Sequence, residues 1–193
     1  MRIALLTTNA GKRAELQALL GDLAEIEAVD VAVEENGETM DDNARIKAEA
    51  ALRATGLPGL GDDSGLEVDA LDGRPGVRSA RYAGEGAGDA DNIARLLDEL
   101  RRMRVRRRGA RFRCVLALAW PGEPLRTFDG VCRGRILEAP RGAGGFGYDP
   151  VFEVPDLKRT FAELQPDEKN ARSHRGKAVA LLRAWLANRR AAK

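Results

Sequence analysis

The chain has very little of the residues that build metal–sulfur sites, disulfide frameworks or histidine-based catalysis. Its 193 residues include two cysteines, Cys114 and Cys132, and one histidine, His174. Two cysteines without CxxC spacing cannot form a disulfide framework, and they argue against zinc or iron–sulfur chemistry. A single histidine excludes a multi-histidine metal site and makes a Ser-His-Asp triad hard to build.

Long apolar runs and an excess of either charge are also missing. No stretch approaches the roughly 18–20 apolar residues that span a bilayer. The first apolar run, residues 3–6, is shorter than the about 7–15 residues of a signal peptide. We therefore expect a cytoplasmic protein. The 32 Lys+Arg residues nearly balance 30 Asp+Glu, and this argues against a general nucleic-acid or membrane binder.

The residues that are present suit a globular α/β fold. The chain is 44% hydrophobic, enough for a sizeable core in one domain, residues 1–193, or in two lobes around a shared core. Hydrophobic spacing predicts strands at 3–6 and 114–120, and helices from Lys12, from about Thr39 to 55, after 84–88 and over 173–188. Asp129-Gly130, between short apolar pairs, predicts a hairpin turn. The alternation of strands and helices followed by a hairpin favours a mixed sheet.

The first polar cluster, TTNAGK at residues 7–12, lies where a strand passes into a helix. Backbone N–H groups at a helix N-terminus attract anions, and the hydroxyls, amide and Lys12 ammonium in this turn strengthen that attraction for phosphate. The turn is not a P-loop, because Leu6 stands where its first glycine is required. A simple capped helix with a solvated lysine fits this pattern as well.

The second cluster is the acidic pair Asp62-Asp63, which lies between Gly61 and Ser64-Gly65. We expect these residues in a glycine-flanked loop. Adjacent carboxylates repel each other, so the pair favours a nearby cation such as Mg²⁺, which prefers oxygen ligands. Glu34 or Glu35 could supply a further ligand. The alternative is a solvated acidic turn.

Two further clusters contain potential contacts to a nucleobase. The glycine-rich segment at residues 142–150 carries Phe146 and Tyr148 in a chain that is only 5% aromatic, and aromatic rings can stack on bases. They could equally anchor the loop to the core. Residues 168–177 gather hydrogen-bond donors before and within the last helix, including His174, which alone is more often structural. The run 101–113 contains eight arginines, but it lacks the aromatic pattern of a nucleic-acid site, and we expect no stable nucleic-acid partner.

Taken together, four segments of this sequence resemble the inosine triphosphate pyrophosphatase family, also called Ham1-like. They are TTNAGK (7–12), DDSGLEVDALDGRPGVRSARYAG (62–84), GGFGYDP (144–150) and EKNARSHRGKA (168–178), and they occur in register along the chain. One departure is that Met40 and Asp42 stand where the family commonly has Phe and Glu. Both replacements keep the apolar or acidic character.

The resemblance implies an α/β fold with a long mixed sheet flanked by helices, and two lobes with a central active-site cleft. It implies a homodimer that uses Mg²⁺, with Mn²⁺ as a possible substitute. The implied reaction is hydrolysis of deaminated purine nucleoside triphosphates (ITP, dITP, XTP) to the monophosphate and pyrophosphate, which cleanses the nucleotide pool.

The resemblance also implies roles for individual residues. Asp63 would be the general base and a metal ligand, with Asp62 and Glu34 (or Glu35) completing the metal shell. The triphosphate would be bound by Thr7, Thr8, Asn9, Ala10, Gly11, Lys12 and Lys47. The nucleoside would be bound by Ser64, Phe146, Gly147, Tyr148, Asp149, Lys169, Ser173, His174 and Arg175.

Two other functions remain compatible with the sequence. One is a Maf-like or other nucleotide pyrophosphatase with a different base specificity, acting on a similar scaffold. The other is a nucleotide- or RNA-binding module without catalysis, for which the arginine run is the only support.

Overall fold

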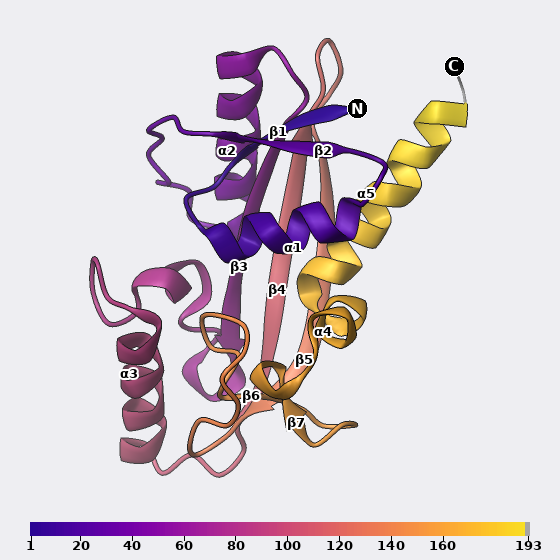
Figure 1. Ribbon diagram of the computed structural model, residues 1–193. Coiled ribbons are helices and arrows are strands. Elements are labelled where there is room, and N and C mark those ends of the chain that lie inside the picture. Colours follow the sequence, from indigo (N-terminus) through magenta and orange to yellow (C-terminus); the bar gives the residue numbers. More distant parts are fainter. Residues whose placement is uncertain (192–193) are drawn as a thin grey trace. The chain divides into compact units, whose positions relative to one another are not determined.

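The computed structural model describes residues 1–191, and it arranges them as a mixed seven-stranded sheet flanked by helices (Figure 1). The strand order is β2-β1-β3-β4-β5-β6-β7. Strand β1 pairs in parallel with β2 and β3, whereas β6 pairs antiparallel with β5 and β7. The prediction of an α/β fold with a mixed sheet is confirmed.

The elements follow one another along the chain with these bounds. The strands are β1 (Arg2–Leu6), β2 (Glu25–Val29), β3 (Gly59–Val68), β4 (Gly109–Ala119), β5 (Arg126–Ile136), β6 (Phe152–Val154) and β7 (Arg159–Thr160). The α-helices are α1 (Ala10–Leu20), α2 (Met40–Thr55), α3 (Asp89–Arg102), α4 (Pro166–Arg172) and α5 (His174–Ala191). Among the described residues, no helix combines the length and the apolar character needed to cross a membrane.

The chain forms two compact units, each assembled from separate stretches of sequence. The first comprises Met1–Asp63, Cys114–Val131 and the chain from Ser173 onward. The second comprises Ser64–Arg113 and Cys132–Arg172. Strands β3, β4 and β5 contribute residues to both units.

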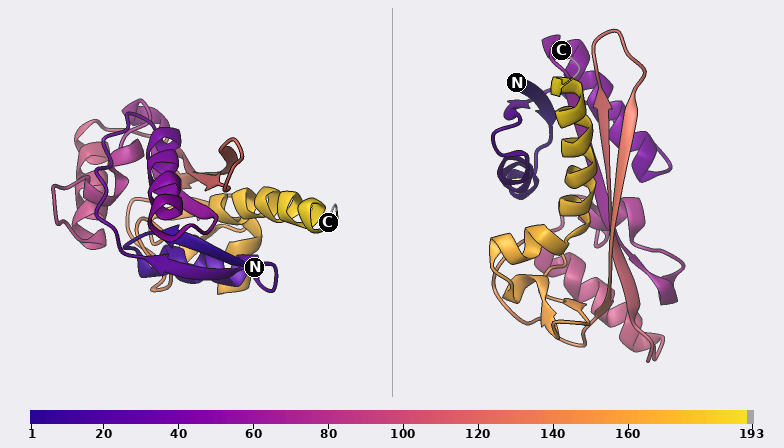
Figure 2. Two further views of the ribbon diagram at one scale, coloured as in Figure 1. Left: turned by 90° about the horizontal axis from the view of Figure 1, so that it is seen from above. Right: turned by 90° about the vertical axis from the view of Figure 1, so that its right-hand side faces the viewer.

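In the first unit, helices cover both faces of the sheet, and the alternating side chains of β1 pack against both layers. Ile3 and Leu5 belong to the apolar cluster that α1 and α5 form on one face. Ala4 and Leu6 belong to a second cluster, which they form with Ala50 and Ala51 of α2. Successive strand residues point to opposite faces, so a run of four apolar residues is buried on both sides, and Figure 2 shows α5 and α2 on opposite faces.

The second unit has its own core, in which α3 packs its apolar stripe against the sheet. Ile93, Leu96, Leu97 and Leu100 of α3 join this core. At its centre, Phe112 lies 4.6 Å from Phe152 and 5.9 Å from Phe161, measured between ring centroids. Three mutually packed rings supply a large apolar area at low conformational cost.

The predicted helix ends are confirmed where capping is local. Thr39 caps α2: its hydroxyl accepts from the Asp42 backbone N–H at 3.1 Å, and the Asp42 carboxylate accepts from the Thr39 N–H at 3.1 Å. The helix ends at Gly56, whose φ of +71° is left-handed. The replacement of the usual Glu by Asp42 therefore keeps the capping box.

The predicted hairpin turn at Asp129-Gly130 is wrong. Strand β5 runs without a break from Arg126 to Ile136, and the connection between β4 and β5 is made by residues 120–125. A Cβ on Gly130 would lie 2.0 Å from the His174 carbonyl oxygen. Gly130 therefore serves the close approach of α5 to the strand and not a turn.

We predict that Gly130→Ala destabilises the protein through a clash with the backbone of α5. Overpacking of this kind lowers the free energy of unfolding by about 1–3 kcal/mol. Urea unfolding followed by circular dichroism measures the change. Arg133→Ala, at an exposed position of the same strand, is the control and should stay within about 0.5 kcal/mol of wild type. Equal stability of Gly130→Ala and wild type would contradict the proposed packing.

Candidate functional site

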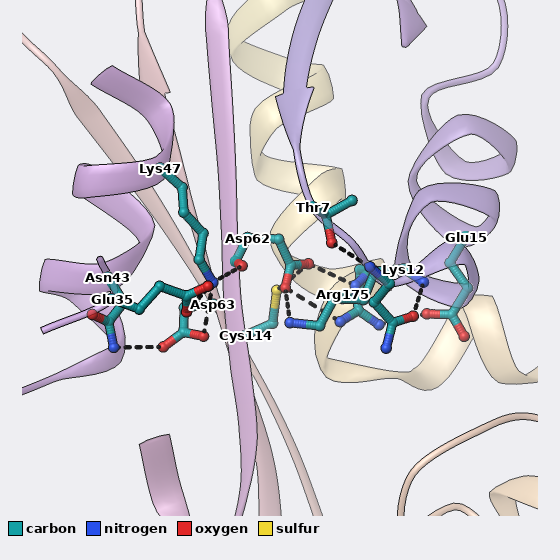
Figure 3. Close-up of polar contacts among 11 residues, drawn as sticks. Thr7, Lys12, Glu15, Glu35, Asn43, Lys47, Asp62, Asp63, Cys114 and Arg175 are labelled. Atoms are coloured by element: carbon teal, nitrogen blue, oxygen red, sulfur yellow. Dashed lines mark hydrogen bonds and ion pairs between the residues drawn. The ribbon is translucent and has the colours of Figure 1, made fainter. Parts of the chain in front are cut away.

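The acidic pair Asp62-Asp63 lies inside strand β3 and not in the predicted loop. Consecutive residues of a strand point to opposite faces of the sheet, so the two carboxylates are separated although their residues are adjacent. Figure 3 shows Asp62 directed toward Lys12 and Arg175, and Asp63 directed toward Lys47 and Asn43. Each carboxylate therefore has its own set of partners.

Asp62 is the buried counter-ion of two cations. Its Oδ1 lies 2.8 Å from the Lys12 ammonium, and its Oδ2 accepts a 2.7 Å hydrogen bond from Nε of Arg175. Burial alone would raise the pKa of Asp62, but the charges of Arg175 and Lys12 overcome that effect and hold it well below its ordinary value. Asp62 is therefore ionised at any pH at which the protein is expected to work.

Arg175 is held from a second side by a carboxylate that sequence reasoning missed. Its guanidinium is buried, and Nη1 donates to Glu15 of α1 at 2.5 Å. Although burial opposes its charge, Asp62 raises the pKa of Arg175 further above its ordinary value. Glu15 and Arg175 are 160 positions apart in sequence, so no local pattern could have paired them.

Cys114 of β4 completes the surroundings of Asp62. Its Sγ lies 3.6 Å from the Asp62 Oδ2 atom. Burial and the neighbouring Asp62 charge raise the pKa of Cys114 well above its ordinary value. This setting favours the neutral thiol, which is a poor nucleophile.

Asp63 meets two side chains from one face of α2. Its Oδ1 lies 3.4 Å from the Lys47 ammonium, and its Oδ2 accepts from the Asn43 amide at 3.4 Å. Residues four apart on a helix share a face. Gly61 lets that face approach β3, because a Cβ there would lie 2.0 Å from the Ala44 carbonyl oxygen.

Lys47 also bridges to Glu35, whose Oε2 lies 2.6 Å from its ammonium. Burial lowers the pKa of Lys47, but Asp63 and Glu35 together raise it above its ordinary value. For Asp63, burial raises the pKa by more than the charges of Lys47 and Lys12 lower it, so its pKa lies above the ordinary value. One ammonium therefore serves two carboxylates on this face of the sheet.

The three predicted metal ligands, Asp62, Asp63 and Glu34, do not point toward a common position. Glu34 is an exposed residue of the segment before α2, and Asp62 faces away from Asp63. Within residues 1–191 no three His, Cys, Asp or Glu side chains are grouped so that they could hold an ion together. On the Asp63 face, Asp63 and Glu35 share the Lys47 ammonium.

The predicted phosphate turn caps helix α1. The Asn9 side chain accepts from the Lys12 backbone N–H at 2.9 Å, and the Asn9 N–H donates to the Thr7 hydroxyl at 3.2 Å. Thr8 and Ala10 are exposed and Gly11 is half-buried. The turn thus combines a capped helix with a lysine whose ammonium already contacts a carboxylate.

In the second unit the structure brings Asp149, Lys169 and Phe146 together. The Lys169 ammonium lies 2.6 Å from the Asp149 Oδ2 and 4.6 Å from the centroid of the Phe146 ring. The same Asp149 oxygen accepts from the Phe146 N–H at 2.9 Å. A Cβ on Gly145, whose φ is +73°, would lie 2.0 Å from that oxygen. The glycine-rich loop therefore encloses a buried ion pair.

Other predicted nucleoside-binding residues have structural partners of their own. Tyr148 is buried in the core, and its hydroxyl donates to the Ser79 carbonyl at 2.9 Å. The Gly147 N–H donates to the Asp89 carboxylate at 2.6 Å. Phe146 is half-buried whereas Tyr148 is buried. The contacts of Phe146, Tyr148, Gly147 and Ser64 with a substrate stay predictions.

Ser173 and His174 lie at the start of α5, in the first unit. The Ser173 hydroxyl accepts from the Gly176 N–H at 3.0 Å, as a helix-capping residue does. His174 is 5% exposed. Ser173 therefore helps to fix the helix end that carries Arg175.

We predict that Asp62→Asn lowers the free energy of unfolding by about 3–5 kcal/mol at pH 7, because it leaves buried cations without their partner. The pKa of Asp62 is depressed when the protein is folded. Its contribution is therefore present above the ordinary value of 3.8 and is lost as the pH falls toward the lower folded value.

Urea unfolding at pH 7 and at about pH 3 tests this, and the difference from wild type should narrow at the lower pH. Glu49→Gln, at the exposed Arg53–Glu49 pair, is the control and should change stability by at most about 1 kcal/mol. A difference of equal size at both pH values would refute the role of the Asp62 charge.

Comparison of the sequence with known proteins identifies a family. Residues 3–185 match the model of the Ham1 family. A dITP/XTP pyrophosphatase from Geobacillus kaustophilus is 53% identical over 188 residues, which cover 93% of this chain and 91% of that protein. One from Geobacter sulfurreducens is 50% identical over 191 residues, with 96% of both chains covered.

Solved structures give the same result. A HAM1 protein from Coxiella burnetii superposes with a TM-score of 0.88 at 45% identity, over 97% of this chain and 99% of the other. The Staphylococcus aureus Ham1 protein gives a TM-score of 0.88 at 39% identity, over 98% and 100% of the two chains. The family match, the identities and the superpositions together show that this chain belongs to the Ham1 family.

Proposed function

We propose that this protein hydrolyses deaminated purine nucleoside triphosphates, such as ITP, dITP and XTP, to the nucleoside monophosphate and pyrophosphate. The observation that supports this most directly is the setting of Asp63. It is a largely buried carboxylate that meets a lysine and an amide in a chain of the Ham1 family. The relatives named above are dITP/XTP pyrophosphatases.

The triphosphate is bound by two lysine side chains, each of which forms ion pairs with carboxylates in this structure. Lys12 contacts Asp62, and Lys47 contacts Asp63 and Glu35. Phosphate oxygens compete for the same ammonium protons, and the N-terminus of α1, at Thr7, Thr8, Asn9, Ala10 and Gly11, adds backbone donors. Because Lys12 and Lys47 are already positioned by these ion pairs, binding requires little further ordering of their side chains.

Asp63 is the general base. It accepts a proton from a water molecule while the water oxygen forms a bond to the α-phosphorus. The bond from that phosphorus to the oxygen bridging to the β-phosphate breaks, and pyrophosphate leaves with the electron pair. Lys12 and Lys47 stabilise the negative charge that develops on the leaving group.

The donor set suits a hard divalent cation. Asp63 and Glu35 already share one positive charge, the Lys47 ammonium, and carboxylate oxygens are the ligands that Mg²⁺ and Mn²⁺ prefer. We propose that Asp63 holds Mg²⁺ together with Glu35 or the adjacent Glu34. The ion would supply charge neutralisation at the phosphates. Asp62 then serves Lys12 and Arg175 rather than the metal.

Residues from the glycine-rich loop and the last two helices read the base. Phe146 offers a ring to the purine, and Lys169 carries only donors, which suit the 6-carbonyl of hypoxanthine and xanthine but oppose the 6-amino group of adenine. Asp149, Ser173, His174 and Arg175 complete the proposed set, with Ser64, Gly147 and Tyr148. We further propose that the protein acts in the cytoplasm as a homodimer.

We predict that the protein releases pyrophosphate, and not orthophosphate, from ITP and XTP at rates far above those for ATP. The test is a panel of nucleoside triphosphates with Mg²⁺, scored for both products. Asp63→Asn is the control: it should lose about 10²–10⁴-fold in kcat, because an amide cannot take a proton. Turnover confined to pyrimidine or modified nucleotides would indicate a different nucleotide pyrophosphatase. No turnover, together with tight RNA binding, would indicate a binding module.

We also predict an absolute requirement for a divalent cation. Activity should vanish in excess EDTA and return when Mg²⁺ or Mn²⁺ is supplied above the chelator concentration. Zn²⁺ should substitute poorly, because one histidine and two cysteines without CxxC spacing do not make up its usual ligand set. Full activity in excess EDTA would overturn the metal assignment while leaving the substrate assignment intact.

A further inference from the structure

We propose that Asn43 is a positioning residue, which holds the Asp63 carboxylate in a fixed relation to the segment that carries Glu35. The inference rests on the proposed function, because it assigns Asn43 a part in the same hydrolytic site. The sequence assigned Asn43 no role, and the case for one rests on its contacts.

The Asn43 side chain uses both ends of its amide. Its Nδ2 donates to the Asp63 Oδ2 at 3.4 Å, and its Oδ1 accepts from the Gly37 backbone N–H at 2.9 Å. The residue is 2% exposed, so water cannot replace either partner without a rearrangement. The longer of the two bonds is on the catalytic side, where hydrogen bonds commonly tighten once substrate is bound.

The segment before α2 that carries Glu35 and Gly37 packs closely against this helix. A Cβ on Gly37 would lie 2.7 Å from the Asn43 Oδ1 and 2.5 Å from the Asp42 Cβ. Residues 30–37 have no helix or strand of their own, so contacts such as the Asn43–Gly37 bond decide where they lie. Glu35 is two residues away and reaches the Lys47 ammonium.

The chemistry of an amide suits this position. Lys47 already supplies the positive charge on this face, and it contacts both Asp63 and Glu35. A neutral donor orients the second Asp63 oxygen without cancelling its charge, which stays available for a cation and for a proton. Asn43 therefore supplies geometry, while Lys47 supplies charge (Figure 3).

The chain contains a matched residue outside the site. Asn92 occupies the same place in α3: its Oδ1 accepts from the Ala83 N–H at 2.8 Å, and its Nδ2 donates to the Ala80 carbonyl at 3.1 Å. It is also 2% exposed, and both asparagines stand four residues after their helix N-cap, Thr39 or Gly88. Asn92 contacts no catalytic carboxylate, so Asn92→Ala reproduces the structural loss alone.

The experiment compares Asn43→Ala with Asn92→Ala in the full chain. The readouts are Tm, kcat and KM for ITP, and the affinity for Mn²⁺ alone, measured by electron paramagnetic resonance without nucleotide. We expect both variants to lose thermal stability. Only Asn43→Ala should lose about 10–100-fold in kcat and in Mn²⁺ affinity, as variants of residues that orient metal ligands do, with KM changed by less.

The outcomes separate this inference from the proposed function. Wild-type kcat and Mn²⁺ affinity in folded Asn43→Ala, or an equal kcat loss in Asn92→Ala, would overturn the positioning role. If Asn43→Ala does not fold, Asn43→Asp keeps an acceptor for Gly37 but replaces the donor to Asp63 by a carboxylate oxygen. Wild-type kcat in that variant would overturn the positioning role. If the wild type releases no pyrophosphate, the proposed function fails, and Mn²⁺ affinity still decides the case of Asn43.

Discussion

The site depends on the alternation of side chains at one pair of residues in strand β3. Two adjacent carboxylates in a loop would share one environment and repel each other. In a strand they face opposite sides, and here each side supplies its own cation: Arg175 and Lys12 for Asp62, and Lys47 for Asp63. The repulsion that made the pair conspicuous in the sequence is thereby relieved without a shared ion.

This arrangement gives the two carboxylates different chemistry. Asp62 is fully buried and surrounded by positive charge, so its pKa is far depressed and it works as a fixed negative charge. Asp63 has a raised pKa and a neutral donor on one oxygen. These opposite pKa shifts agree with the roles that we propose, Asp62 as a fixed charge and Asp63 as the base.

The sequence predicted best those features that are decided within a few residues. The Thr39 capping box, the end of α2 at Gly56 and the apolar run of β4 depend on local chemistry, and all are found in the structure. The roles of Gly130 and of the acidic pair were misjudged for one reason. Glycine and aspartate are typical of turns. Gly130 lies in a strand because α5 packs closely against it, and Asp62 lies in a strand because Arg175, 113 positions away, neutralises its charge.

The site residues divide in the same way. The resemblance pointed to Lys12, Lys47 and Arg175, whose roles toward a substrate stay predictions, whereas nothing in the sequence pointed to Glu15 or Asn43. Both are polar residues in helices, of a type that the sequence pattern does not distinguish from solvent-exposed positions. Their partners come from other segments of the chain and become known only from the tertiary structure. A single sequence indicates residue types suited to phosphate chemistry, but the side chains that orient them are defined by contacts between distant segments.

The order of synthesis bears on when the first unit can be assembled. This unit draws on three stretches of the chain, and Arg175 of α5 follows its partner Asp62 by 113 positions. Until α5 has been made, Asp62 lacks this cation, and the apolar face that α5 covers is exposed to water. A chain truncated before α5 therefore cannot assemble the charge network on which the site is built.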